Sequence, residues 1–140
     1  MSRNAYWEHL LHITWHTKNN EPLLVGPIEK LVHEFLRCRA LESPGTIVHE
    51  VGGIEDRVHL AVSLPPTVAP AAWIGQMKGS SSHFVNHRPN AIGYFDWQVG
   101  YGLVGFGKSD LKWVVEYVRN QREHHYRRTT LDRLERIDPE

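Results

Sequence analysis

Apolar and polar residues follow two periodicities along this chain, one typical of strands and one of helices. Residues 10–17 are rich in β-branched and aromatic side chains and end at a polar turn, which indicates a strand. Apolar side chains recur at helical spacing over residues 28–36, after a Pro27 that favours a helix start. Over residues 58–64 every second position is apolar, as in a strand. The whole pattern predicts strand, helix, strand, strand, helix, strand and helix over residues 10–17, 26–43, 46–51, 58–64, 69–85, 95–106 and from 109 onward.

Local signals refine three positions in this scheme. Gly52 and Gly53 are expected to separate the two middle strands. Ser109 and Asp110 would begin the last helix with a hydroxyl cap and an acidic group at its positive end. The charged tail after Arg127 has room for one short helix.

The order of elements matches the split βαβ arrangement of a ferredoxin-like fold. This is an α+β, RRM-like antiparallel sheet with helices on one face, here with an added C-terminal helix. Because no linker, repeat or low-complexity segment divides the chain, we expect a single domain over residues 1–140, with its core at about 6–128 and a charged tail at 129–140. Such a fold serves many unrelated functions, so the function must be argued from individual residues.

The composition of the chain indicates its domain size and cellular location but not its activity. A chain of 140 residues that is 41% hydrophobic can bury the core of one domain. Cys38 is the single cysteine, which excludes an internal disulfide. No apolar run approaches the roughly 18 residues that cross a bilayer, and no signal-peptide pattern opens the chain, so we expect a cytoplasmic protein without a membrane partner. Sixteen basic residues balance sixteen acidic ones, so net charge gives no argument for a polyanionic partner.

One short motif resembles a nucleotide site. Residues 102–109 fit the P-loop pattern G-x-x-x-x-G-K-[ST], and a helix is predicted to follow. A P-loop cradles phosphate with backbone N–H groups at a helix N-terminus. However, the bulky Val104 and Phe106 alternate with glycines, as in a strand. A P-loop nucleotide-binding protein is therefore kept only as a remote alternative.

The last predicted helix carries the residues best suited to chemistry. Tyr117 and Gln121 are four residues apart and project from the same face of that helix. A tyrosine held in line with a phosphodiester can act as a nucleophile, but its phenol needs activation because its ordinary pKa is about 10. The amide oxygen of Gln121 and the imidazole of His59 are groups that can hold a divalent ion. The alternative is ordinary packing, in which Tyr117 and His59 have no chemical role.

Several separate motifs, in the right order from about residue 11 to 125, resemble those of the single-tyrosine HUH transposases. This group includes the IS200-like and REP-associated tyrosine transposases. The matching stretches are residues 12–18 (HITWHTK), 51–62 (VGGIEDRVHLAV), 78–82 (KGSSS), 97–102 (WQVGYG) and 117–125 (YVRNQREHH).

The resemblance implies an activity and the residues that carry it. Tyr117 matches the nucleophile that forms a 5′-phosphotyrosine with single-stranded DNA and leaves a free 3′-hydroxyl. His59 matches the second histidine of the HUH pair, and Gln121 matches the helix residue that completes a Mg²⁺ or Mn²⁺ site. The resemblance further implies a homodimer that binds hairpins at the ends of a mobile element, often with the tyrosine supplied to the partner's metal site.

One position departs from the family pattern. The HUH motif has histidine, a bulky apolar residue and histidine, whereas this chain has Arg57, Val58 and His59. Strand alternation places residues 57 and 59 on one face, but a guanidinium has no lone pair for a metal. Three interpretations stay open: Arg57 binds the scissile phosphate, the chain is a domesticated DNA-hairpin-binding relative with impaired catalysis, or a nearby His49 or Asp56 compensates.

Candidate DNA contacts are basic and polar side chains near these motifs. Basic grooves and stacking aromatic rings hold single-stranded and hairpin DNA. The candidates for DNA binding are Lys18, Lys78, Ser80, Arg119, Arg122 and His124.

Overall fold

A computed structural model describes residues 5–91 and 93–139 of the chain. The sequence predicts no signal peptide at the N-terminus, and residues 1–4 of that stretch lie outside the described residues. The strands are β1 (Leu10–His16), β2 (Ile47–Ile54), β3 (Arg57–Ser63) and β4 (Gly102–Phe106). The helices are α1 (Pro27–Ala40), α2 (Pro70–Asn86), α3 (Leu111–Arg119), α4 (Gln121–Arg127) and α5 (Asp132–Glu135), with short 3-10 turns η1 (Lys18–Asn20) and η2 (Lys108–Asp110).

The four strands form one antiparallel sheet in the order β2-β3-β1-β4. The central strand β1 pairs with β3 on one side and β4 on the other, and Thr14 lies opposite both His59 and Gly102. This order is the one that the split βαβ prediction requires, and the ferredoxin-like α+β fold is confirmed.

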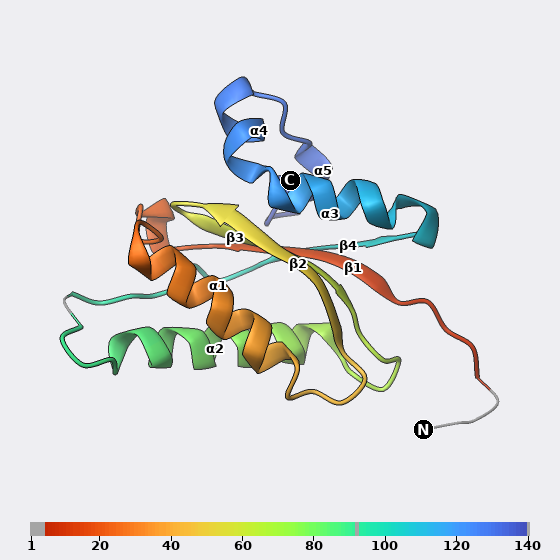
Figure 1. The fold of residues 1–140 in the computed structure, drawn as a ribbon, viewed down its shortest axis with the longest axis horizontal. Coiled ribbons are helices and arrows are strands. Elements are labelled where there is room, and N and C mark those ends of the chain that lie inside the picture. Colours follow the sequence, from red (N-terminus) through yellow and green to blue (C-terminus); the bar gives the residue numbers. More distant parts are fainter. Residues whose placement is uncertain (1–4, 92, 140) are drawn as a thin grey trace.

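Helices cover both faces of the sheet (Figure 1). On one face, α1 and α2 pack over the main core, to which strand residues such as Trp15, Val58 and Leu60 contribute. On the other face lie α3, α4 and α5, where a smaller apolar cluster joins Ala61 of β3 to Val114 and Val118 of α3. Successive side chains of a strand point to opposite faces of the sheet. The residues of β1 and β3 that alternate with the core residues therefore point toward α3.

The boundary between the middle strands differs from the prediction. Gly52 and Gly53 do not separate two strands but lie within β2, and the turn to β3 falls at residues 55–56. A Cβ on Gly52 would be 2.1 Å from the carbonyl oxygen of Val118, so this glycine allows the backbone of α3 to press against the strand. The glycine pair therefore marks a close approach between elements and not a turn.

The fourth strand is shorter than predicted. Residues 95–101 are outside β4, with only Trp97 forming an isolated bridge to Thr17. The Nζ of Lys78 donates to the carbonyl oxygens of Gln98 and Gly100, at 2.6 and 3.0 Å, so these groups bond to a side chain and not to a strand. Residues 102–106 then pair with β1 as strand β4. The P-loop pattern at 102–109 therefore lies largely in a strand, whereas a P-loop would need a loop there to cradle phosphate.

The last predicted helix is divided at Asn120 (φ −100°, ψ 30°) into α3 and α4. Helix α3 begins at Leu111. Ser109 lies one residue earlier than the N-cap, within η2, and the N-cap residue Asp110 makes no side-chain capping bond, so the predicted hydroxyl cap is wrong. The chain reverses at Arg128, which has a positive φ of 57°, and the tail does form the short helix α5. Within the described residues, no helix is both long and apolar enough to cross a membrane.

Candidate active site

Two buried imidazoles lie in the sheet face beneath α3. His12 of β1 and His59 of β3 are both fully buried, and Nε2 of His12 lies 2.9 Å from Nδ1 of His59. The alternation that sends Val58 and Leu60 into the main core sends His59 to this opposite face. Burial, then the charge of the neighbouring His59, lowers the pKa of His12 to about 3, so His12 is neutral at physiological pH.

Tyr117 of α3 lies over this pair. The residue is 2% exposed, and its ring stacks with those of Trp113 and His124, with ring centroids 5.8 and 4.7 Å away. Its hydroxyl donates to Oε2 of Glu135 at 2.5 Å and accepts the N–H of Leu131 at 3.0 Å. Burial and then the bond to Glu135 raise the pKa of Tyr117, so the phenol keeps its proton in this arrangement.

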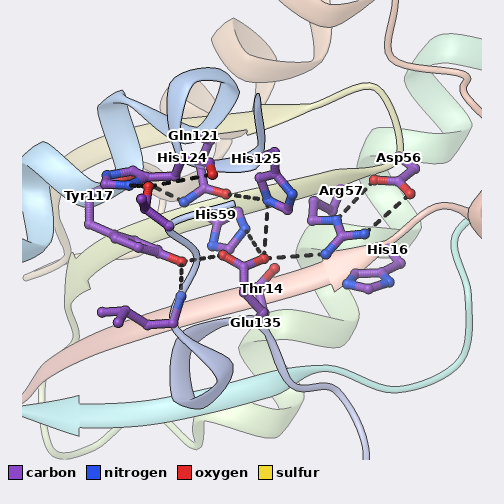
Figure 2. Close-up of polar contacts among 12 residues, drawn as sticks. Thr14, His16, Asp56, Arg57, His59, Tyr117, Gln121, His124, His125 and Glu135 are labelled. Carbon is purple, nitrogen blue, oxygen red and sulfur yellow. Dashed lines mark hydrogen bonds and ion pairs between the residues drawn. The ribbon is translucent and has the colours of Figure 1, made fainter. Parts of the chain in front are cut away.

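Glu135 of α5 joins the groups of this face into one cluster. Its Oε1 lies 3.3 Å from Nε2 of His59, 3.4 Å from Nε2 of His125 and 3.3 Å from Nη1 of Arg57. Figure 2 shows the carboxylate between Tyr117 on one side and Arg57 on the other, with the two imidazoles beside it. Burial raises the pKa of Glu135, but its contacts with His59 and Tyr117 outweigh burial and lower it to about 2. The group is therefore a carboxylate at neutral pH.

Arg57 occupies the expected face beside His59. Its side chain is 18% exposed and pairs with both Asp56, at 2.9 Å, and Glu135. His49 lies elsewhere along the sheet, where its Nε2 is 2.7 Å from Oγ of Ser63. Thus the group facing Arg57 and His59 is Glu135, and Asp56 serves as a partner for the guanidinium.

Gln121 is fully buried at the start of α4. Its Nε2 donates to the carbonyl oxygen of Tyr117 at 3.1 Å, and its Oε1 lies 3.1 Å from Nε2 of His125. In the part of the chain that the structure describes, His59, His125 and Glu135 form a group whose ligand atoms lie within 4.8 Å of one another. Among the described residues, Nε2 of His59 is a buried nitrogen without a hydrogen bond, which is the expected state of a nitrogen that ligates a metal. These donors fit a divalent ion.

Comparison with known proteins places this chain in a family. The sequence profile described as "Transposase IS200 like" matches residues 5–121. The chain belongs to the IS200-like transposase family. Within the family match lie Tyr117, His59, Arg57 and Gln121, whereas His125 and Glu135 lie beyond it.

Two solved structures share the fold of this transposase family member. One is a protein of Deinococcus radiodurans R1 provisionally described as a transposase, with 20% identity and a TM-score of 0.65, covering 86% of this chain and 96% of its own. The other is a REP-associated tyrosine transposase bound to a REP hairpin, with 12% identity and a TM-score of 0.65, covering 89% of this chain and 74% of its own. Among curated proteins, none matches the sequence significantly.

The six candidate DNA-binding side chains all have partners within the chain. Near the segment before β4, Lys18 lies 3.8 Å from Asp96, and Lys78 binds the two carbonyl groups described above. Around a hollow of about 360 Å³, Arg119 and Arg122 pair with Glu50 and Glu29, at 2.9 and 2.6 Å. The remaining two bond to residues four or five positions away in the chain, Ser80 to the carbonyl oxygen of Gln76 and His124 to the hydroxyl of Thr129.

Three site residues were not assigned a role from the sequence. His12 was part of a matching stretch, and the strand alternation around it could have placed it opposite the core. His125 closes another matching stretch, next to His124. Glu135 had no signal, because an acidic residue in a charged tail has no periodicity that fixes its position.

Proposed function

We propose that this protein is a DNA transposase that cuts and rejoins single-stranded DNA through Tyr117. The observation that carries the proposal is the position of Tyr117: its hydroxyl bonds to a carboxylate that also contacts His59 and Arg57. The membership of the chain in the IS200-like transposase family supports the same role.

The reaction is an in-line displacement at phosphorus. Oη of Tyr117, oriented by its hydrogen bond to Oε2 of Glu135, attacks the scissile phosphate and loses its proton to water as the bond from phosphorus to the 3′ oxygen breaks. The 3′ oxygen takes up a proton from water. The product is a 5′-phosphotyrosine and a free 3′-hydroxyl, and attack of another 3′-hydroxyl on the phosphotyrosine rejoins the strands.

Other groups of the chain orient the reactants and offset charge. The rings of Trp113 and His124 stack with Tyr117 and orient it, and Arg57 offers a guanidinium to the phosphate oxygens. His59 and Gln121 are the positions at which Mg²⁺ or Mn²⁺ would be held, and such an ion would stabilise the developing negative charge.

The proposed substrate is single-stranded DNA with hairpin ends, acted on in the cytoplasm by a homodimer. Support for the substrate comes from the fold neighbour, which is bound to a REP hairpin. Lys18, Lys78, Ser80, Arg119, Arg122 and His124 are the proposed contacts, with Arg119 and Arg122 around one hollow.

The test is trapping of the covalent intermediate. We expect a labelled hairpin oligonucleotide from the flanks of the gene to give, with Mn²⁺, a denaturation-resistant adduct that Tyr117→Phe abolishes. Tyr126→Phe is the matched control, because Tyr126 is 88% exposed on α4 and should leave the adduct unchanged. If the wild-type protein binds the hairpin but forms no adduct, the proposal that it cleaves DNA through Tyr117 is wrong.

The second candidate is a DNA-hairpin-binding relative with impaired catalysis. The observation in its favour is Arg57, which stands at the expected first-histidine position and is held by Asp56 and Glu135. If it is correct, the wild-type protein binds the hairpin without cutting it, and Arg57→His creates metal-dependent cleavage. If Arg57→His lowers an existing cleavage rate, Arg57 is part of a working site.

A further inference from the structure

We propose that His125 and Glu135, which follow the part of the chain matched by the family, complete a divalent-metal site with His59. The site is a two-histidine, one-carboxylate set in which Glu135 takes the place of the ligand lost at Arg57. This inference deepens the proposed function, because the ion would act beside Tyr117 in the same cleavage.

The spacing of the donor atoms fits one ion. Oε1 of Glu135 lies 3.3 Å from Nε2 of His59 and 3.4 Å from Nε2 of His125. Two ligands about 2.1 Å from a metal, with about 100° between their bonds, are about 3.2 Å apart. The two separations that involve Glu135 therefore match a shared ion. The two imidazole nitrogens lie within 4.8 Å of each other, and they share the ion when they are no more than about 4.2 Å apart. Oε1 of Gln121, 3.1 Å from Nε2 of His125, has the spacing of a fourth ligand.

The imidazole of His59 has a partner that fixes its role. Nδ1 of His59 is 2.9 Å from Nε2 of His12, and both rings are fully buried. When Nδ1 of His59 donates to His12, Nε2 carries the lone pair, and this is the nitrogen that faces Glu135. His12 is thus a positioning residue for the ligand.

The C-terminal segment is docked in a way that aims Glu135 at the sheet. Leu134 is 5% exposed, and the N–H of Leu131 donates to the hydroxyl of Tyr117. A Cβ on Gly102 would lie 2.0 Å from the carbonyl oxygen of Arg136, so the start of β4 accommodates the segment only because a glycine is there. These contacts hold the carboxylate of Glu135 in place, as a metal ligand requires.

Arg57 does not exclude the ion from this set. Its guanidinium contacts both Asp56 and Glu135, so a carboxylate that is not in the ligand set offsets its charge. With Oε1 on the metal, Glu135 can still accept from Arg57 through its remaining lone pair. Two imidazoles favour Mn²⁺, Co²⁺ or Zn²⁺ over Mg²⁺, which prefers oxygen ligands.

Cobalt binding tests the site without relying on catalysis. We expect the visible absorbance of Co²⁺, titrated into the full metal-stripped chain, to report one ion per chain, and we expect Mg²⁺ to compete poorly. Glu135→Gln and His125→Gln should each weaken Co²⁺ binding by at least about tenfold. Glu123→Gln is the matched control, because Glu123 is 59% exposed on α4 and pairs with Arg127.

The outcomes separate this inference from the proposed function. Unchanged or tighter Co²⁺ binding by both Glu135→Gln and His125→Gln overturns the site; if circular dichroism shows one of them unfolded, the other decides. Arg57→His should tighten Co²⁺ binding by adding a third imidazole, and weaker binding would count against the placement of the ion. Tyr117→Phe should bind Co²⁺ as the wild-type protein does. A variant that loses the covalent adduct but still binds Co²⁺ therefore tests the nucleophile and not the metal site.

Discussion

At the scale of single residues, the site depends on neutral imidazoles packed next to each other. Burial is the first reason why the pKa of His12 falls to about 3, and burial also lowers the pKa of His59. In the unfolded chain His12 and His59 each take up a proton as the pH falls below about 6.5, whereas in the folded chain each does so only at a lower pH. Stability that is present above pH 6.5 is therefore lost as the pH falls toward 3.

This proton linkage gives a prediction for His12. In EDTA, the wild-type protein should lose about 2 kcal/mol of unfolding free energy between pH 7 and pH 5 through His12 alone, and His12→Gln should remove that part of the slope. Urea denaturation at the two pH values measures it. The same pH slope in both proteins would mean that His12 titrates normally.

At the scale of elements, the short helix α5 is the part that completes the site. It contacts β1 and β4, and its position depends on the close approach of Arg136 to Gly102. Strand β4 contains a second glycine, Gly105, whose Cβ would come no nearer than 3.9 Å to another atom. The two glycines therefore differ in what they allow, although they lie in the same strand.

Alanine substitutions separate these two glycines. Gly102→Ala should destabilise the fold by about 1–3 kcal/mol or move the C-terminal segment, and in either case should weaken Co²⁺ binding. Gly105→Ala should change both properties little. Thermal unfolding and the cobalt titration measure the pair, and equal behaviour of the two variants would contradict the docking of α5.

At the scale of the whole molecule, one chain supplies every group of the candidate site. Tyr117 of α3 contacts the carboxylate of Glu135, which lies against His59 of β3 in the same chain. The ring centroids of Tyr117 and His59 are 6.2 Å apart. In this arrangement a homodimer would have two complete sites, each with its own tyrosine.

Mixing two inactive variants tests this arrangement. A mixture of Tyr117→Phe and His59→Ala chains should form no more adduct than either variant alone, because no chain then has both groups. The mixture should be unfolded and refolded together so that mixed dimers form. Recovery of the adduct would show instead that the tyrosine acts in the partner's site.

The sequence determined the fold and the faces on which His59, Tyr117 and Gln121 lie, because both follow local rules. The two-residue period of β3 places Val58 and Leu60 in the core and His59 opposite them, and the helical spacing of Tyr117 and Gln121 places both on one face. The ordered motifs of the family then predicted the roles of these residues.

Only the tertiary structure decided how the site is completed. The chain reversal at Arg128 returns the charged tail to the sheet and sets Glu135 between Tyr117, His59 and Arg57. Likewise, only the tertiary structure shows that Lys78 bonds to the carbonyl groups of Gln98 and Gly100, which precede β4. Contacts between residues distant in sequence depend on loop paths and close backbone approaches, and neither has a local period that the sequence displays.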